Sequence, residues 1–435
     1  MRSDTGARPV AIVGGGFSGT MTAVQLARRG VRSVLLDGSG RMHRGAAYST
    51  TEPAHLLNVP SGKMSASPDR PNDFAEWLGD DGASFAERRA FGRYLAEQAG
   101  GLELLERREL GAVSATPTGE GWTLELDNGE RIEAAALVLA NGNQAPAPMQ
   151  VADRLPDGLF VNNPWGAEAG AAIARAAESS GDVLILGTGL TMIDTVLSLA
   201  AAGHDGRVVA LSRRGLVPRS HAPHEPAPVA LEVVPKGKVL PLWRWLRRRS
   251  GEVGFRAAVE SLRPHSQALW QGLPGAEQRR FLRHARPWWD VHRHRIAPQI
   301  GRALAERIGD GRLEIVAGRI VALDASNGEV VATIIRRGSN SRSNHTFAAV
   351  FNCTGPLGDL RRTRDPLLRQ LLGDGLVRVD ALGMALDVDE RSRAGTRAWA
   401  VGPLTKGRFW EIVAVPDIRG QVAAVAEDIT QELKR

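Results

Sequence analysis

Cysteine is almost absent from this chain, because Cys353 is the single cysteine among 435 residues. One cysteine excludes an intrachain disulfide, a Cys-x-x-Cys redox centre and a cysteine-based zinc site. Long apolar runs are missing as well, since no stretch reaches the roughly 18 residues that a membrane span needs. The apolar run after MRSDTGARPV is too short for the core of a signal peptide. We therefore expect a cytoplasmic protein without a membrane partner.

Lysine is scarce too: only five of the 55 basic residues are lysine, and the rest are arginine. The formal net charge is +7 and the sequence pI is about 10.2. Arginine suits the bidentate recognition of phosphate, although a compositional bias of the source organism would produce the same excess. Because a lysine-rich tail and basic repeats are lacking, we expect no nucleic-acid partner.

A glycine turn stands near the N-terminus. VAIVGGGFSG, residues 10–19, places Gly14, Gly16 and Gly19 in a G-x-G-x-x-G pattern between an apolar strand and a helical pattern. These glycines permit a tight turn, close approach of the backbone to a pyrophosphate and close helix–strand packing. The next apolar strand ends in Asp37, whose carboxylate can accept hydrogen bonds from ribose hydroxyls. The pattern favours an FAD site over another nucleotide or a structural turn.

A second glycine turn lies in LILGTGLTMID, residues 184–194. Gly187 and Gly189 occupy the first two glycine positions, but Met192 occupies the third, which predicts a looser contact between helix and strand. We expect Asp194 in the first helical turn, where the helix dipole favours a carboxylate. Two such turns in one chain predict two dinucleotides that exchange electrons.

The strand after the second turn ends differently from the first. In RVVALSRRG, Ser212, Arg213 and Arg214 stand where the first unit has Asp37. A serine and two arginines suit a 2′-phosphate, so the sequence favours NADP(H) over NAD(H). A solvated basic turn is the alternative.

With these motifs, the chain resembles flavoproteins that bind two dinucleotides, and in particular the family described as FAD/NAD(P)-binding proteins. More distantly, it is similar to class B flavin monooxygenases, including N-hydroxylating ones. The motifs that carry the resemblance are GGGFSG (14–19), GAAY (45–48), LLNVPSGKMSASP (56–68), FGRYL (91–95), LGTGLTMID (186–194), SRRGLVPRSH (212–221), RPWWDVHRHRIAP (286–298), NCTGP (352–356) and GPLTKGRFWE (402–411).

The resemblance implies two sets of cofactor-binding residues. For FAD, it implies a pyrophosphate and ribose loop, a stretch beside the flavin and three later turns, made by Gly14, Gly16, Phe17, Ser18, Gly19, Asp37, Tyr48, Leu57, Asn58, Met64, Gly142, Gly355 and Gly402. For NADP, it implies Gly187, Gly189, Leu190, Thr191, Ser212, Arg213 and Arg214. In the turn of Gly142, Asn141 replaces the threonine of related proteins. The predicted catalytic residues are Asn58, which would bond the flavin or NADP(H), and Trp410, which would stack on a flavin or substrate ring unless it belongs to the core.

The expected fold is α/β, with two Rossmann-like dinucleotide-binding domains, the second inserted in the first. We expect the FAD domain over residues 1–165 and 336–435, and the NADP domain over 166–335. Residues 222–310, rich in Arg, Trp and His, predict a helical insertion that could cap the active site. The segment Asp127-Asn128-Gly129 predicts a hairpin.

Other residue groups favour simpler interpretations. His284, His292 and His294 lack the spacing of a helical metal site, so we expect no metal. Arg293, Arg295 and His294 are candidates for contact with substrate or NADP phosphates, and an arginine–histidine surface is the alternative. Trp288 and Trp289 are candidates for ring stacking or core packing, and Cys353 is expected to be a packing residue.

The resemblance also implies a chemistry. NADPH would reduce the flavin, and the reduced flavin would react with molecular oxygen. We therefore expect a flavin monooxygenase that oxygenates a small substrate, with nitrogen-containing molecules among the candidates, through a C4a-hydroperoxide. The first alternative is an FAD-dependent NAD(P)H reductase or dehydrogenase with an organic acceptor, and the second is a redox sensor without turnover.

Overall fold

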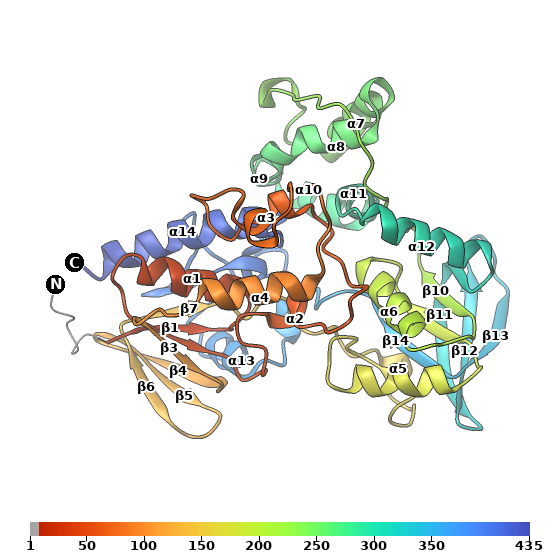
Figure 1. Ribbon diagram of the computed structural model, residues 1–435, viewed down its shortest axis with the longest axis horizontal. Helices are drawn as coiled ribbons and strands as arrows, with labels where there is room; N and C mark the ends of the chain where they lie inside the picture. The colour runs from red at the N-terminus through yellow and green to blue at the C-terminus, as the bar shows by residue number, and fades with distance from the viewer. Residues whose placement is uncertain (1–7) are drawn as a thin grey trace.

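The computed structural model describes residues 8–435 and arranges them around two large sheets and one small sheet (Figure 1). The first large sheet has six strands in the order β15-β16-β7-β1-β2-β3. All neighbouring strands in it are parallel except β15 and β16. Its strands are β1 (Val10–Val13), β2 (Ser33–Leu36), β3 (Leu105–Arg108), β7 (Ala136–Leu139), β15 (Arg393–Gly395) and β16 (Ala398–Ala400).

Both faces of the first sheet are covered. The strands β1 and β7 read VAIV and ALVL and are buried throughout, as expected for parallel strands between two layers. One face packs on α1 (Phe17–Ala27), α4 (Arg88–Gln98) and α14 (Val415–Glu432). The other face packs on α13 (Pro366–Gly373) and on a small antiparallel sheet of β4 (Ala112–Thr118), β5 (Gly121–Leu126) and β6 (Arg131–Ala134). The hairpin predicted at residues 127–129 is confirmed, because it joins β5 to β6.

The second large sheet has seven strands in the order β13-β12-β11-β10-β9-β14-β8. The neighbouring strands β8, β14, β9, β10 and β11 pair in parallel. The strands β11, β12 and β13 form an antiparallel meander. Its strands are β8 (Phe160–Val161), β9 (Val183–Leu186), β10 (Val208–Ser212), β11 (Leu313–Ser326), β12 (Glu329–Arg336), β13 (Arg342–Phe347) and β14 (Ala349–Asn352). All of them lie between β7 and β15 in the chain, so the second sheet is inserted in the first, as predicted.

The limits of the second sheet differ from the predicted domain boundaries. The boundary at residue 335 falls inside β12, and both β13 and β14 still belong to the second sheet. β14 pairs with β9 in the middle of this sheet, so the chain returns to the first sheet only after Asn352. On the other side, β8 joins the second sheet before residue 166. Long-range strand pairing, which has no local signal, sets these limits.

Helices cover the second sheet and also project from it. One face packs on α5 (Glu168–Glu178), α6 (Leu190–Ala201) and α12 (Pro298–Gly309). Since α12 belongs to this layer, the projecting insertion ends before it, earlier than the predicted residue 310. Figure 1 shows α7, α8 and α9 standing away from both sheets. The insertion consists of α7 (Val239–Val253), α8 (Phe255–Leu262), α9 (Ser266–Gln271), α10 (Gly275–Arg280), a π-helical turn (Phe281–Ala285) and α11 (Arg286–Arg293).

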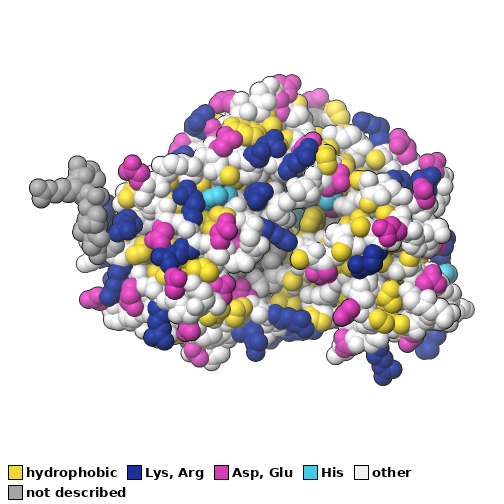
Figure 2. Space-filling model, turned by 60° about the horizontal axis from the view of Figure 1, so that its bottom comes forward, with side chains coloured by type: hydrophobic (Ala, Val, Ile, Leu, Met, Phe, Trp, Pro, Cys, Tyr) yellow, Lys and Arg dark blue, Asp and Glu magenta, His cyan; other side chains and the backbone are white. Residues whose placement is uncertain are grey.

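The surface carries mixed charge. Figure 2 shows basic and acidic side chains interspersed over the face in view. Among residues 8–435, none of the helices combines the length and apolar character that crossing a bilayer requires.

Candidate functional site

The first glycine turn connects β1 to α1. Gly14 has φ +107°, and a Cβ there would lie 2.4 Å from the Ala140 carbonyl oxygen. A Cβ on Gly19 would lie 1.9 Å from the Gly14 carbonyl oxygen, so only glycine allows α1 to approach the turn. The helix begins at Phe17 after Gly16, and no side chain of residues 8–435 caps it. Its first N–H groups are therefore available to an anionic group.

Asp37 lies beside this turn, directly after β2. Its Oδ2 accepts a hydrogen bond from the Gly15 backbone N–H at 2.8 Å, and its Oδ1 accepts one from the Ser39 N–H at 2.7 Å. The side chain is buried. The two backbone donors hold the carboxylate in one orientation and leave lone pairs on both oxygens for ribose hydroxyls.

The residues predicted beside the flavin gather around the start of α1. Phe17, Leu57 and Met64 share one buried cluster, and Tyr48 packs against it. The Tyr48 ring meets the Phe91 ring edge-on, with the centroids 4.7 Å apart. The predicted stretch therefore forms one continuous wall next to the first turn.

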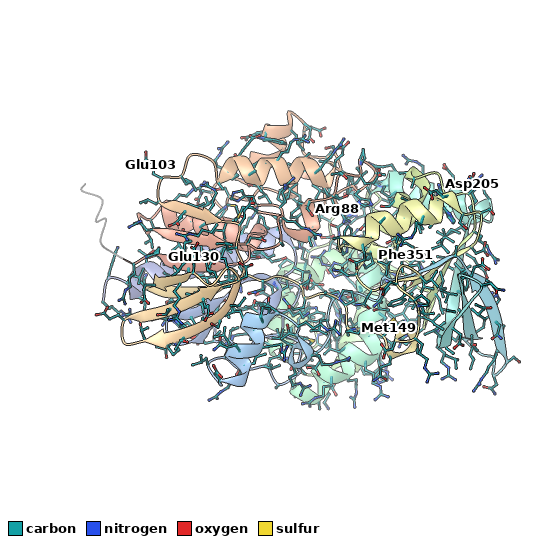
Figure 3. The ribbon with its side chains drawn as sticks, turned by 90° about the horizontal axis from the view of Figure 1, so that it is seen from below. Arg88, Glu103, Glu130, Met149, Asp205 and Phe351 are labelled. Atoms are coloured by element: carbon teal, nitrogen blue, oxygen red, sulfur yellow. The ribbon has the colours of Figure 1, made fainter. Side chains whose placement is uncertain are left out.

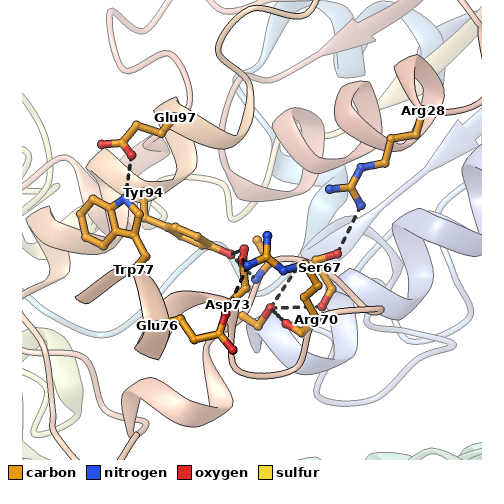
Figure 4. A network of polar contacts seen from close by, with 10 residues as sticks. Arg28, Ser67, Arg70, Asp73, Glu76, Trp77, Tyr94 and Glu97 are labelled. Carbon is orange, nitrogen blue, oxygen red and sulfur yellow. Dashed lines mark hydrogen bonds and ion pairs between the residues drawn. The ribbon is translucent and has the colours of Figure 1, made fainter. Parts of the chain in front are cut away.

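A polar network holds the segment that follows Met64 (Figure 4). The Tyr94 hydroxyl donates to Asp73 Oδ2 at 2.6 Å and accepts from the Ala66 N–H at 3.1 Å. Burial and the bond to Asp73 raise the pKa of Tyr94, which keeps the hydroxyl protonated as a donor. This tyrosine belongs to the FGRYL motif, so the network ties that motif to the flavin-side stretch.

The three later turns lie at different places. A Cβ on Gly402 would approach the Ser18 hydroxyl to 2.4 Å, so Gly402 lies against the first turn. Gly142 follows Ala140 and therefore also lies near the first turn. Gly355 follows β14 of the second sheet, in the connection back to the first sheet, where Leu357 N donates to Gln144 O at 3.1 Å. Gly355 thus follows a strand end that packs against Gly187 of the second turn, whereas Gly402 lies against the first turn.

The second glycine turn repeats the first. The Gly187 N–H donates to Leu211 O at 2.8 Å, as the Gly14 N–H does to Leu36 O at 2.8 Å. Gly187 has φ +112°, and a Cβ there would lie 2.2 Å from the Cys353 carbonyl oxygen. Gly189 precedes α6, which begins with Leu190 and Thr191, and a Cβ on Gly189 would meet open space. Met192, at the third glycine position, is fully buried in the core, and the looser helix–strand contact stays a prediction.

Ser212 is the last residue of β10, and Arg213 and Arg214 follow it. Ser212 Oγ accepts from the Gly215 N–H at 3.0 Å and lies 2.8 Å from Thr188 Oγ1. Arg213 is exposed and Arg214 is half-buried. Within residues 8–435, neither guanidinium has an ion pair or a hydrogen bond. Two free cations therefore stand where the first unit has Asp37.

Buried contacts join the two domains. Arg88 Nη1 lies 2.9 Å from Asp194 Oδ2, and Arg88 Nε donates to Leu56 O at 3.1 Å. The prediction that Asp194 lies in the first turn of its helix is wrong, because α6 begins at Leu190 and Asp194 falls in the second turn. Its carboxylate pairs with Arg88 and does not lie at the N-terminal end of the helix, where the helix dipole would stabilise it.

Asn58 lies at the same boundary between the two domains. Its backbone carbonyl accepts from His221 Nε2 at 3.0 Å, and the residue lines a small cavity with Leu190 and Asp194. Burial lowers the pKa of His221 to about 4, so the ring is neutral. Among residues 8–435 the Asn58 side-chain amide has no hydrogen-bond partner. The structure therefore brings Asn58 next to the second turn with its amide free.

Trp410 lies against the helical insertion. Its ring stacks on Trp270, with centroids 4.6 Å apart, and meets Phe281 edge-on at 5.4 Å. One face of the indole is therefore covered by protein. The role of Trp410 in stacking on a flavin or substrate stays a prediction.

The Arg, His and Trp segment has partners of its own. Arg293 pairs with buried Glu411 at 3.2 Å, and buried Arg295 pairs with Glu260. The Trp289 indole N–H also donates to Glu411, at 2.5 Å. Sequence reasoning missed Glu411 and Arg88, although both belong to or adjoin quoted motifs. Contacts between distant segments, rather than any local pattern, reveal their roles.

Cys353 packs as predicted. It is buried in the core of the second sheet, and its thiol lies 3.4 Å from Thr195 Oγ1. Burial raises the pKa of the thiol to about 12, so the reactive thiolate is disfavoured.

Comparisons with known proteins agree with this geometry. Residues 11–144 match the model of an FAD-NAD(P)-binding family. No curated protein sequence matches the chain. Solved structures with a similar fold include an ornithine N-hydroxylase of Kutzneria sp. 744 in complex with reduced FAD, NADP+ and L-ornithine, at 15% identity and a TM-score of 0.71 over 99% of this chain and 100% of the other.

Two further solved structures with a similar fold are a monooxygenase and a reductase. An L-lysine 6-monooxygenase from Pseudomonas syringae is 16% identical, with a TM-score of 0.69 over 98% of this chain and 99% of the other. A T. acidophilum thioredoxin reductase is 13% identical, with a TM-score of 0.56 over 98% of both chains. The family match therefore covers the first strand–turn–helix unit, and the whole chain shares its fold with these hydroxylases and reductases.

Proposed function

We propose that the protein is an FAD-dependent, NADPH-using monooxygenase that acts on a small molecule with molecular oxygen as co-substrate. One observation carries this proposal: two equivalent glycine turns end central strands of separate sheets, and the Arg88–Asp194 ion pair joins helices α4 and α6 of the two domains. Such an arrangement suits two dinucleotides that exchange a hydride.

The first turn fits FAD. Only glycine fits at residues 14 and 19, and the N-terminus of α1 lacks a cap, so a pyrophosphate can receive its backbone N–H groups. Asp37 would bind the ribose hydroxyls. Tyr48, Leu57 and Met64 would exclude water beside the ring system.

The second turn fits NADP. Gly189 leaves open space before α6, and Arg213 and Arg214, which have no partner within residues 8–435, are available to bind a 2′-phosphate. Asn58, whose amide is free and lies near Leu190, would orient the bound nicotinamide or flavin through a hydrogen bond.

The bound flavin would supply electron transfer from NADPH and the activation of oxygen. Disulfide chemistry, as in thioredoxin reductase, requires a reactive cysteine in the protein that performs it. This chain has only Cys353, which is buried and held as a thiol. The absence of a cysteine pair therefore favours an oxygenase, and a reductase of an organic acceptor is the second candidate.

Stoichiometry tests the proposal. We expect NADPH to reduce the purified, FAD-loaded protein under anaerobic conditions faster than NADH does. We then expect ¹⁸O from ¹⁸O₂ to enter a product when candidate small molecules, amines among them, are supplied. Flavin reduction with an acceptor reduced and no ¹⁸O incorporated would identify the second candidate. Nucleotide binding without flavin reduction would contradict both.

A further inference from the structure

A cavity of about 60 Å³ lies between the helical insertion and the segment that ends in Trp410. Four indole rings line it, from Trp243, Trp270, Trp289 and Trp410. Among residues 8–435, Ser266 brings the one hydroxyl to its wall, and that hydroxyl donates to Leu262 O at 3.3 Å. The other lining residues are apolar.

The indole N–H groups of two tryptophans in the cavity wall donate hydrogen bonds to other parts of the protein. The Trp270 N–H donates to Gly407 O at 2.8 Å, and the Trp289 N–H donates to Glu411 Oε1 at 2.5 Å. These bonds fix both rings and leave apolar surface toward the cavity. An apolar cavity of this kind stays dry, and an empty one costs stability because its walls lack contact partners.

Unusual backbone geometry adjoins the same cavity. Phe281, which lines it, begins the π-helical turn Phe281–Ala285. Such turns are rare and occur often at functional sites. Glu411, next to Trp410, has φ +65°, a conformation that costs a non-glycine residue energy. Glu411 also binds Trp289 and Arg293, so these contacts hold the strained backbone in place.

The cavity is connected to the candidate FAD site by one short segment. That segment starts at Gly402, which lies against Ser18 of the first turn, and ends at Trp410 in the cavity wall. None of the lining residues that the structure describes is charged. Arg286 lies over the Trp410 ring, 5.9 Å from its centroid, and pairs with Asp290 at 3.2 Å, while Arg293 pairs with Glu411. A charged substrate group would therefore find no free counter-ion in the wall.

We propose that this cavity binds an uncharged apolar ring of the substrate, so that the substrate class is a single-ring aromatic or alicyclic molecule. This inference rests on the proposed function. The cavity is smaller than the roughly 150 Å³ void that accepts benzene in another, engineered protein. A whole ring therefore requires the walls to part, and the π-helical turn that begins at Phe281 is an irregular helical element of the wall.

Toluene is the probe for the test. We expect isothermal titration calorimetry to detect toluene binding to the FAD-loaded full-length protein. Leu246→Phe, which fills the cavity from α7, should weaken binding by about tenfold or more. Leu240→Phe on the same helix is the matched control, because Leu240 is 50% exposed, and it should change binding less than twofold.

A second variant guards against a folding defect in Leu246→Phe. Leu269→Ala enlarges the cavity from α9 and should strengthen the binding of toluene or admit the larger naphthalene. Absence of toluene binding to the natural protein would overturn the inference, as would equal binding by the natural protein and Leu246→Phe.

The same preparation separates this inference from the proposed function. Anaerobic reduction of its flavin by NADPH requires no occupant in the cavity. Flavin reduction without toluene binding would overturn the substrate class alone. Toluene binding without flavin reduction would overturn the proposed function, and with it the identification of the bound ring as substrate.

Discussion

Arg88 of α4 and Asp194 of α6 form a buried ion pair of 2.9 Å across the boundary between the two sheets. Figure 3 shows Arg88 between the two halves of the molecule. Both side chains are at most 15% exposed, so each charge is stabilised by the opposite charge of its partner. The pair therefore couples the placement of the second turn to the flavin-side segment that Arg88 also holds through Leu56.

Removing one partner of this ion pair should lower the stability of the folded protein. Arg88→Met leaves Asp194 buried without a counter-charge, which we expect to lower stability by about 3–5 kcal/mol. Arg88→Met combined with Asp194→Leu should recover much of this loss, as measured by thermal unfolding. Arg8→Met is the control, because its pair with Glu120 is exposed and should matter by less than about 1 kcal/mol. Equal losses in both single variants would contradict a special role for the Arg88–Asp194 pair.

Asp37 should control the affinity for FAD. Asp37→Asn replaces one acceptor oxygen by a donor, so one bond from Gly15 or Ser39 is lost along with the charge near the ribose. We expect FAD to dissociate at least about tenfold more readily, roughly the effect of one charge-assisted hydrogen bond. Fluorescence of released FAD measures this. Asp81→Asn is the control, since Asp81 also accepts a backbone N–H, from Ala83, on an exposed loop. Unchanged FAD retention in Asp37→Asn would show that the carboxylate does not bind the ribose.

Arg213 and Arg214 should select the nicotinamide cofactor. Changing both to Gln removes two free cations while retaining polar side chains. We expect the Kd for NADPH to rise by about tenfold or more, because two charge-assisted contacts to phosphate are lost, and the Kd for NADH to stay within about twofold. Rates of anaerobic flavin reduction at increasing cofactor concentration give both constants. Arg312→Gln removes an exposed charge at the opposite end of β10, next to Val208, and should affect neither constant. Equal weakening of both cofactors would argue against recognition of a 2′-phosphate.

His221 should make the domain boundary sensitive to pH. Burial lowers the pKa of His221 from 6.5 to about 4, with Arg295 and Lys63 adding to the shift and the bond to Asn58 O opposing it. Between these two values the unfolded chain binds more protons, so stability rises with pH. The contribution of His221 is complete above pH 6.5 and is lost as the pH falls toward 4.

Thermal unfolding between pH 7.5 and 4.5 checks this expectation. The natural protein should lose more thermal stability on acidification than His221→Gln does, because the variant lacks the titrating ring. His224→Gln changes an exposed histidine and should follow the natural protein. Parallel curves for the natural protein and His221→Gln would refute a role for His221 in the pH response.

Much of the candidate cofactor site was predictable from local sequence. Each glycine turn consists of contiguous residues, and the turn geometry itself demands glycine at residues 14 and 187. Asp37 was predictable for the same reason, since it follows the adjacent strand. The stretch from Tyr48 to Met64 could be placed only by resemblance to a family, because its residues have no periodic pattern. The structure gathers that stretch against Phe17.

Other features were not predictable because they depend on partners far apart in the chain. The true limit of the second sheet depends on β14 pairing with β9. The position of Trp410 depends on Trp270 in the insertion, and the position of Asp194 depends on Arg88. Gly355 was predicted to belong to a later turn of the FAD site, yet it follows β14, which pairs with β9 in the second sheet.

The sequence by itself determined the α/β class, the two strand–turn–helix units and the difference between Asp37 and the Arg213–Arg214 pair. These features follow from short-range sterics and from the chemistry of adjacent side chains. Only the tertiary structure decided how the units face each other, where the insertion meets the first domain and which tryptophans enclose a cavity. Those outcomes arise from packing and buried charge pairing between segments that no local pattern relates.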